Sequence, residues 1–136
     1  MSKLFVYCDG ASRGNPGEAG IGYLIKNEKG EVIKRVGDYI GHTTNNVAEY
    51  TALKHALLDC LKLNGKEIMV YTDSELMVKQ LKGEYRVKNQ GLLVLYNEVM
   101  DLIKKFDTFN INHIPRERNK EADKLANQGI DKGLTK

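Results

Sequence analysis

Four acidic residues stand where a carboxylate could take part in chemistry: Asp9, Glu49, Asp73 and Asp123. Asp9 closes an apolar run at residues 4–9, and Asp73 follows another at residues 67–72. A carboxylate at the C-terminal end of a buried strand lies at the edge of a sheet, where open α/β sheets bind their ligands. Two strands that end in this way predict that both side chains meet at one edge.

The other two carboxylates belong to helical patterns. Glu49 is the charged member of a stripe whose other members are apolar: Leu53, Ala56, Leu57 and Cys60. Asp123 lies beside the apolar stripe of the last helix. Both therefore come early in helices that must pack against the sheet, and both are expected to reach the edge that carries Asp9 and Asp73.

Each carboxylate also has a purely structural interpretation. Asp9 precedes Gly10 and fits a turn, and Asp73 fits the N-cap of the next helix. Glu49 lies three residues after Asn46, which is the spacing of a capping box. Taken singly, these residues leave the choice between cap and active site open, and only their convergence favours the site.

Four carboxylates brought together repel one another and raise each other's pKa unless a cation neutralises them. Oxygen ligands without His or Cys favour a hard ion such as Mg²⁺, for which Mn²⁺ can substitute. Two such ions about 3.5–4 Å apart can clamp a phosphodiester, one activating water and the other stabilising the leaving oxygen. This pattern predicts phosphodiester hydrolysis without a covalent enzyme intermediate.

The composition sets broad limits. The chain has 136 residues, with 41% hydrophobic and 29% charged, as expected for one soluble globular domain over residues 1–136. No apolar run approaches the roughly 20 residues that cross a membrane, and no signal peptide is apparent, so we expect a cytoplasmic protein without membrane contact. Cys8 and Cys60 lie in apolar stretches and are expected to be reduced. A net charge of +3 permits a polyanionic partner.

The pattern predicts an α/β fold with a five-stranded mixed sheet flanked by helices. Strands are expected at residues 4–9, 19–26, 31–40, 67–72 and 109–114, and helices at 47–63, 75–82, 92–106 and 120–132. Residues 10–17 are expected to be a turn, Asn119 to cap the last helix, and residues 133–136 to fray. Three antiparallel strands come first, and two strands then return parallel to the first by right-handed crossovers.

Four short motifs together point to a known family. They are Asp9-Gly10 with Gly14-Asn15-Pro16-Gly17, Thr43-Thr44-Asn45-Asn46 with Glu49, Thr72-Asp73-Ser74, and Asn119 with Ala122-Asp123 and Leu125-Ala126. The sequence resembles the type 1 ribonuclease H family over nearly its whole length. The resemblance implies a ribonuclease H-like fold in which Asp9, Glu49, Asp73 and Asp123 bind two Mg²⁺. It also implies cleavage of the RNA strand of an RNA–DNA hybrid, with 3′-hydroxyl and 5′-phosphate ends, and we expect the protein to be a monomer.

The same resemblance suggests contacts with the hybrid. The expected substrate-binding residues are Gly10, Ser12, Asn15, Thr44, Asn45 and Asn46. Val47 stands where many members have an arginine, Glu75 replaces a common glutamine, and the basic protrusion of many members is shortened. The family's loop histidine has no clear counterpart, so we expect Arg116 or Arg118 to assist product release or phosphate handling.

Other functions were weighed. An actin-like ATP-binding domain shares a related sheet and an Asp-Gly turn, but it needs two such halves and a far longer chain. A hybrid-binding module without catalysis conflicts with the presence of all four carboxylates. DNA strand transfer or junction cleavage would keep the fold and change the reaction. The Gly-Asn-Pro-Gly turn and the Thr-Asn-Asn loop favour the hybrid nuclease.

Overall fold

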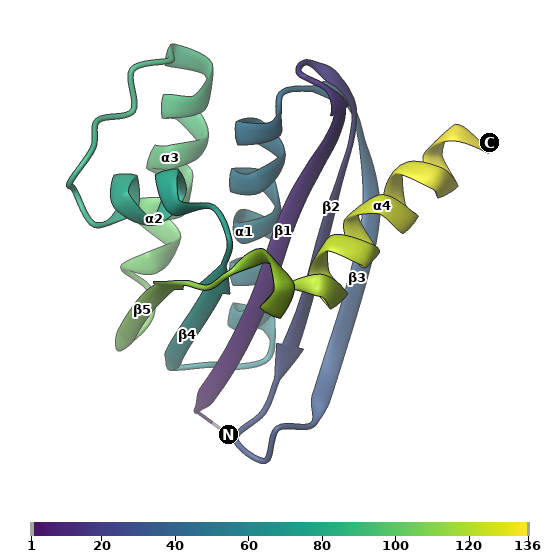
Figure 1. The fold of residues 1–136 in the computed structure, drawn as a ribbon. Helices are drawn as coiled ribbons and strands as arrows, with labels where there is room; N and C mark the ends of the chain where they lie inside the picture. The colour runs from purple at the N-terminus through teal and green to yellow at the C-terminus, as the bar shows by residue number, and fades with distance from the viewer. Residues whose placement is uncertain (1, 136) are drawn as a thin grey trace.

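The structure is a computed structural model that describes residues 2–135. A five-stranded sheet in the order β3-β2-β1-β4-β5 forms its centre (Figure 1). The strands are β1 Lys3–Gly14, β2 Gly17–Lys26, β3 Val32–Thr43, β4 Glu67–Thr72 and β5 Thr108–His113. β1 and β3 both pair antiparallel to β2, whereas β4 pairs parallel to β1 and to β5. The predicted mixed sheet, with β3 as an edge strand, is confirmed.

Helices cover both faces of this sheet (Figure 1). They are α1 Asn45–Lys62, α2 Glu75–Leu81, α3 Gln90–Ile103 and α4 Lys120–Leu134, with a short 3₁₀ helix η1 at Arg116–Arg118. α1 packs on β1 and β2, and α3 packs on α1, so α1 to α3 form one layer. α4 packs on β2, β3 and part of β1 from the opposite side. The two helices that carry Glu49 and Asp123 therefore approach Asp9 from opposite faces.

The main core lies between the sheet and α1. The predicted stripe Leu53, Ala56, Leu57 and Cys60 is fully buried, against Leu4, Val6 and Cys8 of β1. Burial of such side chains contributes about 1.5–3 kcal/mol each for the large aliphatic ones. Both cysteines are free and buried, as expected. This core determines how far along β1 the helix α1 sits, and hence where Glu49 lies.

The first strand is longer than predicted. Residues 10–14 were expected to form a turn, but they continue β1 and pair with residues 17–21 of β2, leaving only a tight connection at Asn15-Pro16. Backbone hydrogen bonds to β2 keep these residues in the sheet, although their side chains are small or polar. Asp9 therefore lies in the middle of β1 and not at its end. The strand that ends beside it is β4, which pairs with β1 as far as Tyr7 and Tyr71.

The predicted capping box at the start of α1 was wrong. α1 begins at Asn45, and its N-cap is Thr44, whose hydroxyl accepts a hydrogen bond from the Val47 amide at 3.3 Å. Asn46 therefore lies inside the helix, and Glu49 forms no capping box with it. The Glu49 carboxylate instead accepts a hydrogen bond from the backbone amide of Gly10. Sequence spacing alone cannot distinguish a carboxylate that bonds its own helix from one that bonds a neighbouring strand.

Asn119 occupies the N-cap position of α4 but makes no side-chain capping bond. Its amide nitrogen donates to the carbonyl of Cys8 at 2.9 Å, which ties the start of α4 to β1 beside Asp9. The helix continues through Leu134, two residues beyond the predicted end at residue 132, and Lys136 lies outside the described residues. Asn119 is therefore the N-cap residue, as predicted, but its side chain binds the backbone of β1 instead of capping the helix.

A buried acidic group links α1 to the antiparallel strands. Asp59 is 7% exposed, accepts a hydrogen bond from the hydroxyl of Tyr23 and lies 3.3 Å from the amine of Lys34. Tyr23→Phe should lower the free energy of unfolding by about 1–3 kcal/mol, because a buried acceptor loses its donor. Thermal unfolding of Tyr23→Phe and of Tyr39→Phe, whose hydroxyl bond to Glu18 is exposed, would test this. Equal melting temperatures would contradict it.

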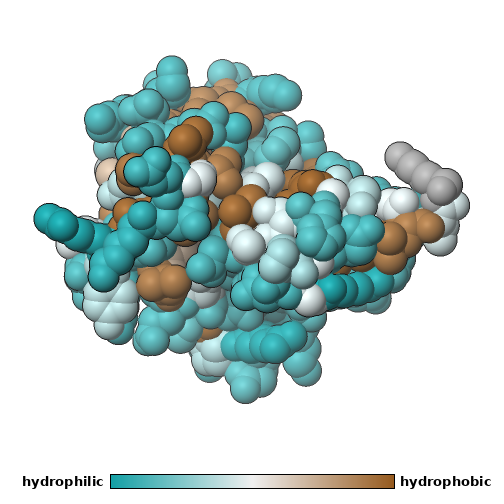
Figure 2. Space-filling model, turned by 90° about the horizontal axis from the view of Figure 1, so that it is seen from above, coloured by the Kyte–Doolittle hydropathy of each residue, from teal (hydrophilic) through white to brown (hydrophobic). Residues whose placement is uncertain are grey.

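Within residues 2–135, no helix combines the length and apolar character needed to cross a lipid bilayer. The face seen from above in Figure 2 is mostly hydrophilic, and its apolar groups form small, separate patches. Such a surface is compatible with a polar or charged ligand.

Candidate active site

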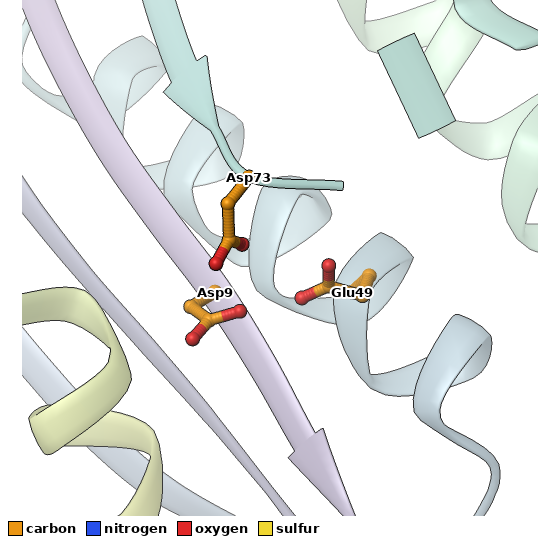
Figure 3. A group of neighbouring side chains, drawn as sticks. All are labelled: Asp9, Glu49 and Asp73. Atoms are coloured by element: carbon orange, nitrogen blue, oxygen red, sulfur yellow. The ribbon is translucent and has the colours of Figure 1, made fainter. Parts of the chain in front are cut away.

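Three of the predicted carboxylates meet beside the middle of β1, where β4 ends (Figure 3). Asp9 points out of the middle of β1, Asp73 follows the end of β4, and Glu49 comes from the first turns of α1. One oxygen from each lies within 4.8 Å of the others. β4 ends beside Asp9 because it pairs in parallel with only the first half of β1. The crossover topology is thus what brings these residues together.

Two glycines allow the helices to come this close. A Cβ at Gly10 would lie 2.2 Å from the backbone carbon of Ala48 in α1. A Cβ at Gly22, which pairs with Asp9, would lie 2.2 Å from the carbonyl oxygen of Ala122 in α4. Real side chains essentially never tolerate such distances. Gly10 therefore sets the position of Glu49, and Gly22 sets that of Asp123.

Asp123 joins the group from the opposite face. It lines the same open cleft, of about 530 Å³. It does not belong to the tight group of three, and its side chain remains 33% accessible. The four predicted carboxylates therefore line one cleft, with three close together and the fourth at its side.

The cleft carries a large excess of negative charge. Glu75 adds a fifth carboxylate to its lining, and Arg116 is the one cationic side chain there among residues 2–135. Burial raises the pKa of Asp9, and the neighbouring charge of Glu49 raises it further. Burial also raises the pKa of Glu49, although the bond from the Gly10 amide opposes this shift. Such a site favours the binding of a cation, because a cation would relieve the repulsion at once.

Three of the six predicted substrate-binding residues line the cleft, and the other three lie outside its lining. Gly10, Ser12 and Asn45 line it directly. Asn15 is exposed at the β1–β2 turn, and its side-chain oxygen accepts a hydrogen bond from the Asn45 amide at 3.0 Å. The turn and the start of α1 are therefore held together on this side of the carboxylates. Thr44 is used in capping, and Asn46 is exposed on α1 but does not line the cleft.

The two arginines occupy different places. Arg116 lines the cleft, and its guanidinium lies 4.0 Å from the Asp123 carboxylate. Arg118 lines a neighbouring hollow with Tyr7 and Lys26. The structure thus places Arg116, and not Arg118, among the candidate catalytic groups.

Asn127 is a residue of the cleft that none of the sequence motifs indicated. This residue lines the cleft, and its amide donates to the Asp123 backbone carbonyl at 3.1 Å and to the side-chain oxygen at 3.5 Å. Arg13 contacts its side-chain oxygen in turn, at 3.4 Å. Asn127 therefore orients Asp123. The signal in the sequence was the four-residue spacing, which places two polar residues on one face of a helix.

Comparisons with known proteins agree with this geometry. A family profile described as "Reverse transcriptase-like" matches residues 7–129. A ribonuclease H of Coxiella burnetii (strain Dugway 5J108-111) is 30% identical over 145 residues, covering 96% of this chain and 92% of that protein. This chain belongs to the ribonuclease H family. The resemblance inferred from the motifs is confirmed.

Longer proteins contain a similar ribonuclease H region. "Bifunctional protein Rv2228c" of Mycobacterium tuberculosis (strain ATCC 25618 / H37Rv) is 42% identical over 130 residues. The alignment covers 95% of this chain but only 36% of the mycobacterial protein. This ribonuclease H chain therefore spans about a third of the length of that relative.

Solved ribonuclease H structures superpose closely on this one. The crystal structure of RNase H1 from the halophilic archaeon Halobacterium salinarum NRC-1 has a TM-score of 0.93 at 38% identity, covering 96% of this chain and 99% of that one. The structure of LC11-RNase H1 in complex with an RNA/DNA hybrid has a TM-score of 0.91 at 43% identity, with the same coverage of both chains. The ribonuclease H-like fold that the motif resemblance implied is confirmed.

Proposed function

We propose that this chain is a metal-dependent endoribonuclease that hydrolyses the RNA strand of an RNA–DNA hybrid, leaving 3′-hydroxyl and 5′-phosphate ends. The observation that carries the proposal is the meeting of Asp9, Glu49 and Asp73 within 4.8 Å in an open cleft. The similarity to a ribonuclease H1 that has been crystallised with a hybrid supports the choice of substrate. We expect the chain to act as a monomer.

The residues present fit a divalent cation. The donors are carboxylate oxygens, which suit Mg²⁺ and also admit Mn²⁺, and they repel one another when no cation is bound. We assign Asp9, Glu49, Asp73 and Asp123 as the ligands of two Mg²⁺. When bound, the ions would activate water and stabilise the charge that develops on the phosphodiester. The Asp123 side chain is 33% accessible, which suits a ligand next to the water or the leaving group.

The rest of the cleft would position the RNA. Ser12 and the backbone of Gly10 lie on the β1 side of the carboxylates, and Asn45 lies on the α1 side. Asn15, Thr44 and Asn46 lie next to these groups in the chain or bind to them, and we assign them further contacts with the hybrid. Such donors and acceptors can contact the 2′-hydroxyls of the RNA strand, which distinguish RNA from DNA in the wide minor groove. Recognition of the hybrid would then depend on groups on both sides of the carboxylates.

The direct test is a cleavage assay with a labelled RNA–DNA hybrid and Mg²⁺, run beside a DNA duplex, an RNA duplex and ATP. We expect cleavage of the hybrid, abolished by a chelator and restored by Mg²⁺ or Mn²⁺, and mass spectrometry of the products should show 5′-phosphate ends. Turnover of ATP, or cutting that persists without metal, would contradict the proposal. Cleavage of the DNA duplex would favour strand transfer or junction chemistry instead.

The arginines allow a second test. Arg116→Ala should lower the steady-state rate several-fold, because this cation lies at the cleft beside Asp123, while its exposed side chain limits the effect to about tenfold or less. Arg118→Ala serves as the matched control and should change the cleavage of a blunt hybrid far less. Single-turnover rates measured in parallel separate chemistry from product release. Wild-type values for Arg116→Ala in both assays would contradict a role for this residue.

A further inference from the structure

One face of the sheet lacks a helical cover over β4 and the first half of β1. α4 packs on β2, β3 and the later part of β1, and the other helices lie behind the sheet (Figure 1). Alternate residues of the two uncovered strands point out from this face, and the register pairs Phe5 with Met69 and Tyr7 with Tyr71. Their side chains are only partly buried. An open sheet face would ordinarily carry polar side chains, whereas this one carries three aromatic rings.

The rings are arranged as a platform. Tyr7 and Tyr71 stack with their centroids 4.9 Å apart and their planes 20° from parallel. The amine of Lys26 lies 5.0 Å from the Tyr7 centroid, and that of Lys3 lies 5.5 Å from the Phe5 centroid. Stacked rings flanked by cations are the usual elements of surfaces that bind single-stranded nucleic acid.

Two hollows border the platform and share Tyr7 and Lys26. The larger, of about 320 Å³, also contacts Phe5 and Tyr71. The smaller, of about 160 Å³, extends to Arg118 at the start of α4. Lys3, Lys26 and Arg118 form no salt bridge with any described residue, whereas Glu121 beside them is held by Arg35 at 2.6 Å. The three cations therefore remain available to phosphate groups. Glu28 also lines the larger hollow.

The platform adjoins the carboxylates. Tyr7 lies two residues before Asp9 on the same face of β1, and Tyr71 lies two residues before Asp73. Two residues of a strand span only about 7 Å. A nucleic-acid strand that passes the carboxylates could thus continue directly onto the rings.

We propose that this face, formed by Phe5, Tyr7, Tyr71, Lys3 and Lys26, binds single-stranded RNA that continues beyond the hybrid. The inference rests on the proposed function, because it takes the strand held at the carboxylates to be RNA. The unpaired continuation of that strand is the nearest nucleic acid to the platform. The rings accept any base, since every base has a π face, and the cations contact its phosphates. The ribonuclease would thereby favour hybrids that end in an RNA overhang.

The test compares KM and kcat for four hybrids of identical duplex: blunt, with a 5′ RNA tail, with a 3′ RNA tail, and with a DNA tail. We expect one RNA tail to lower KM, with kcat nearly unchanged. Tyr71→Thr should raise the KM of that substrate roughly 5- to 150-fold, as the loss of one stacked base predicts. Tyr71→Phe should keep the benefit of the tail, and Tyr39→Thr, which removes an exposed tyrosine on β3, is the matched control.

Thermal unfolding of each variant shows whether it is folded. Lys26→Gln provides a second probe that leaves the rings in place, and it should weaken the tail effect and make it less sensitive to salt. Equal KM values for blunt and RNA-tailed hybrids, with normal blunt cleavage, would overturn this inference and leave the proposed function intact. A benefit from the DNA tail alone would also overturn it. Failure to cleave any hybrid would instead reject the proposed function.

Discussion

Asp9→Asn should reduce hybrid cleavage by more than about 100-fold while the protein stays folded. Loss of a group that merely supports a metal ligand already costs about 10–100-fold in affinity or activity, so loss of the ligand should cost more. Carboxylate oxygens of Asp9, Glu49 and Asp73 lie within 4.8 Å of one another, and Asp123 lines the same cleft. Asn preserves the shape of the side chain and removes its charge. Asp73→Asn should have a similar effect on the rate.

The same substitution should stabilise the protein when no metal is present. Burial, with the charge of Glu49, raises the pKa of Asp9 above the ordinary value of 3.8. The folded state thus holds this proton more tightly than the unfolded state, so its contribution to stability is lost as the pH rises above about 4. Asn cannot lose a proton. In the presence of a chelator, the melting temperature of Asp9→Asn should therefore exceed that of the wild type, by more at pH 8 than at pH 5.

Asp107→Asn is the control for both measurements, because this exposed carboxylate lies outside the cleft and forms no ion pair among residues 2–135. It should change neither the rate nor the pH dependence of stability. Addition of Mg²⁺ should raise the melting temperature of the wild type more than that of Asp9→Asn, since a ligand stabilises only the state that binds it. Near wild-type turnover by Asp9→Asn would contradict the site assignment.

Gly22→Ala should strongly destabilise the protein. The new Cβ would lie 2.2 Å from the Ala122 carbonyl oxygen and 2.4 Å from the Ala126 amide nitrogen, so backbone must move. Forcing a methyl group into a packed interface costs about 1–3 kcal/mol, or more where backbone blocks it. We expect a fall of roughly 10 °C in the melting temperature. Because α4 carries Asp123, displacement of the helix should also lower kcat in the fraction that stays folded.

Gly91→Ala is the matched control. This glycine lies on the exposed first turn of α3, where a Cβ would meet only the side-chain oxygen of Asn89, at 3.3 Å. Alanine is the better helix former by about 1 kcal/mol, so the control should melt at the same or a higher temperature. A Gly22→Ala variant with wild-type stability and rate would show that α4 does not depend on close contact with β2.

The sequence alone was sufficient for the element order, the mixed sheet and the four carboxylates. Apolar periodicity reports which face of each segment is buried, and the crossover rule then orders the strands. The stripe of α1 that begins with Glu49 is an example. Because its apolar members face the core, its one acidic member was expected at the edge of the core. These inferences depend on local patterns, which a sequence contains.

Tertiary structure decided what depends on partners distant in the chain. Asn46 and Thr44 are both competent caps, and only the path of β3 into α1 selects Thr44. Asn119 has the right residue type for a cap but bonds Cys8, which is 111 positions away. The continuation of β1 past Asp9, the close approach of two helices at Gly10 and Gly22, and the support of Asp123 by Asn127 likewise follow from packing. A hydrogen bond or a steric contact across the fold depends on coordinates, and no local spacing encodes them.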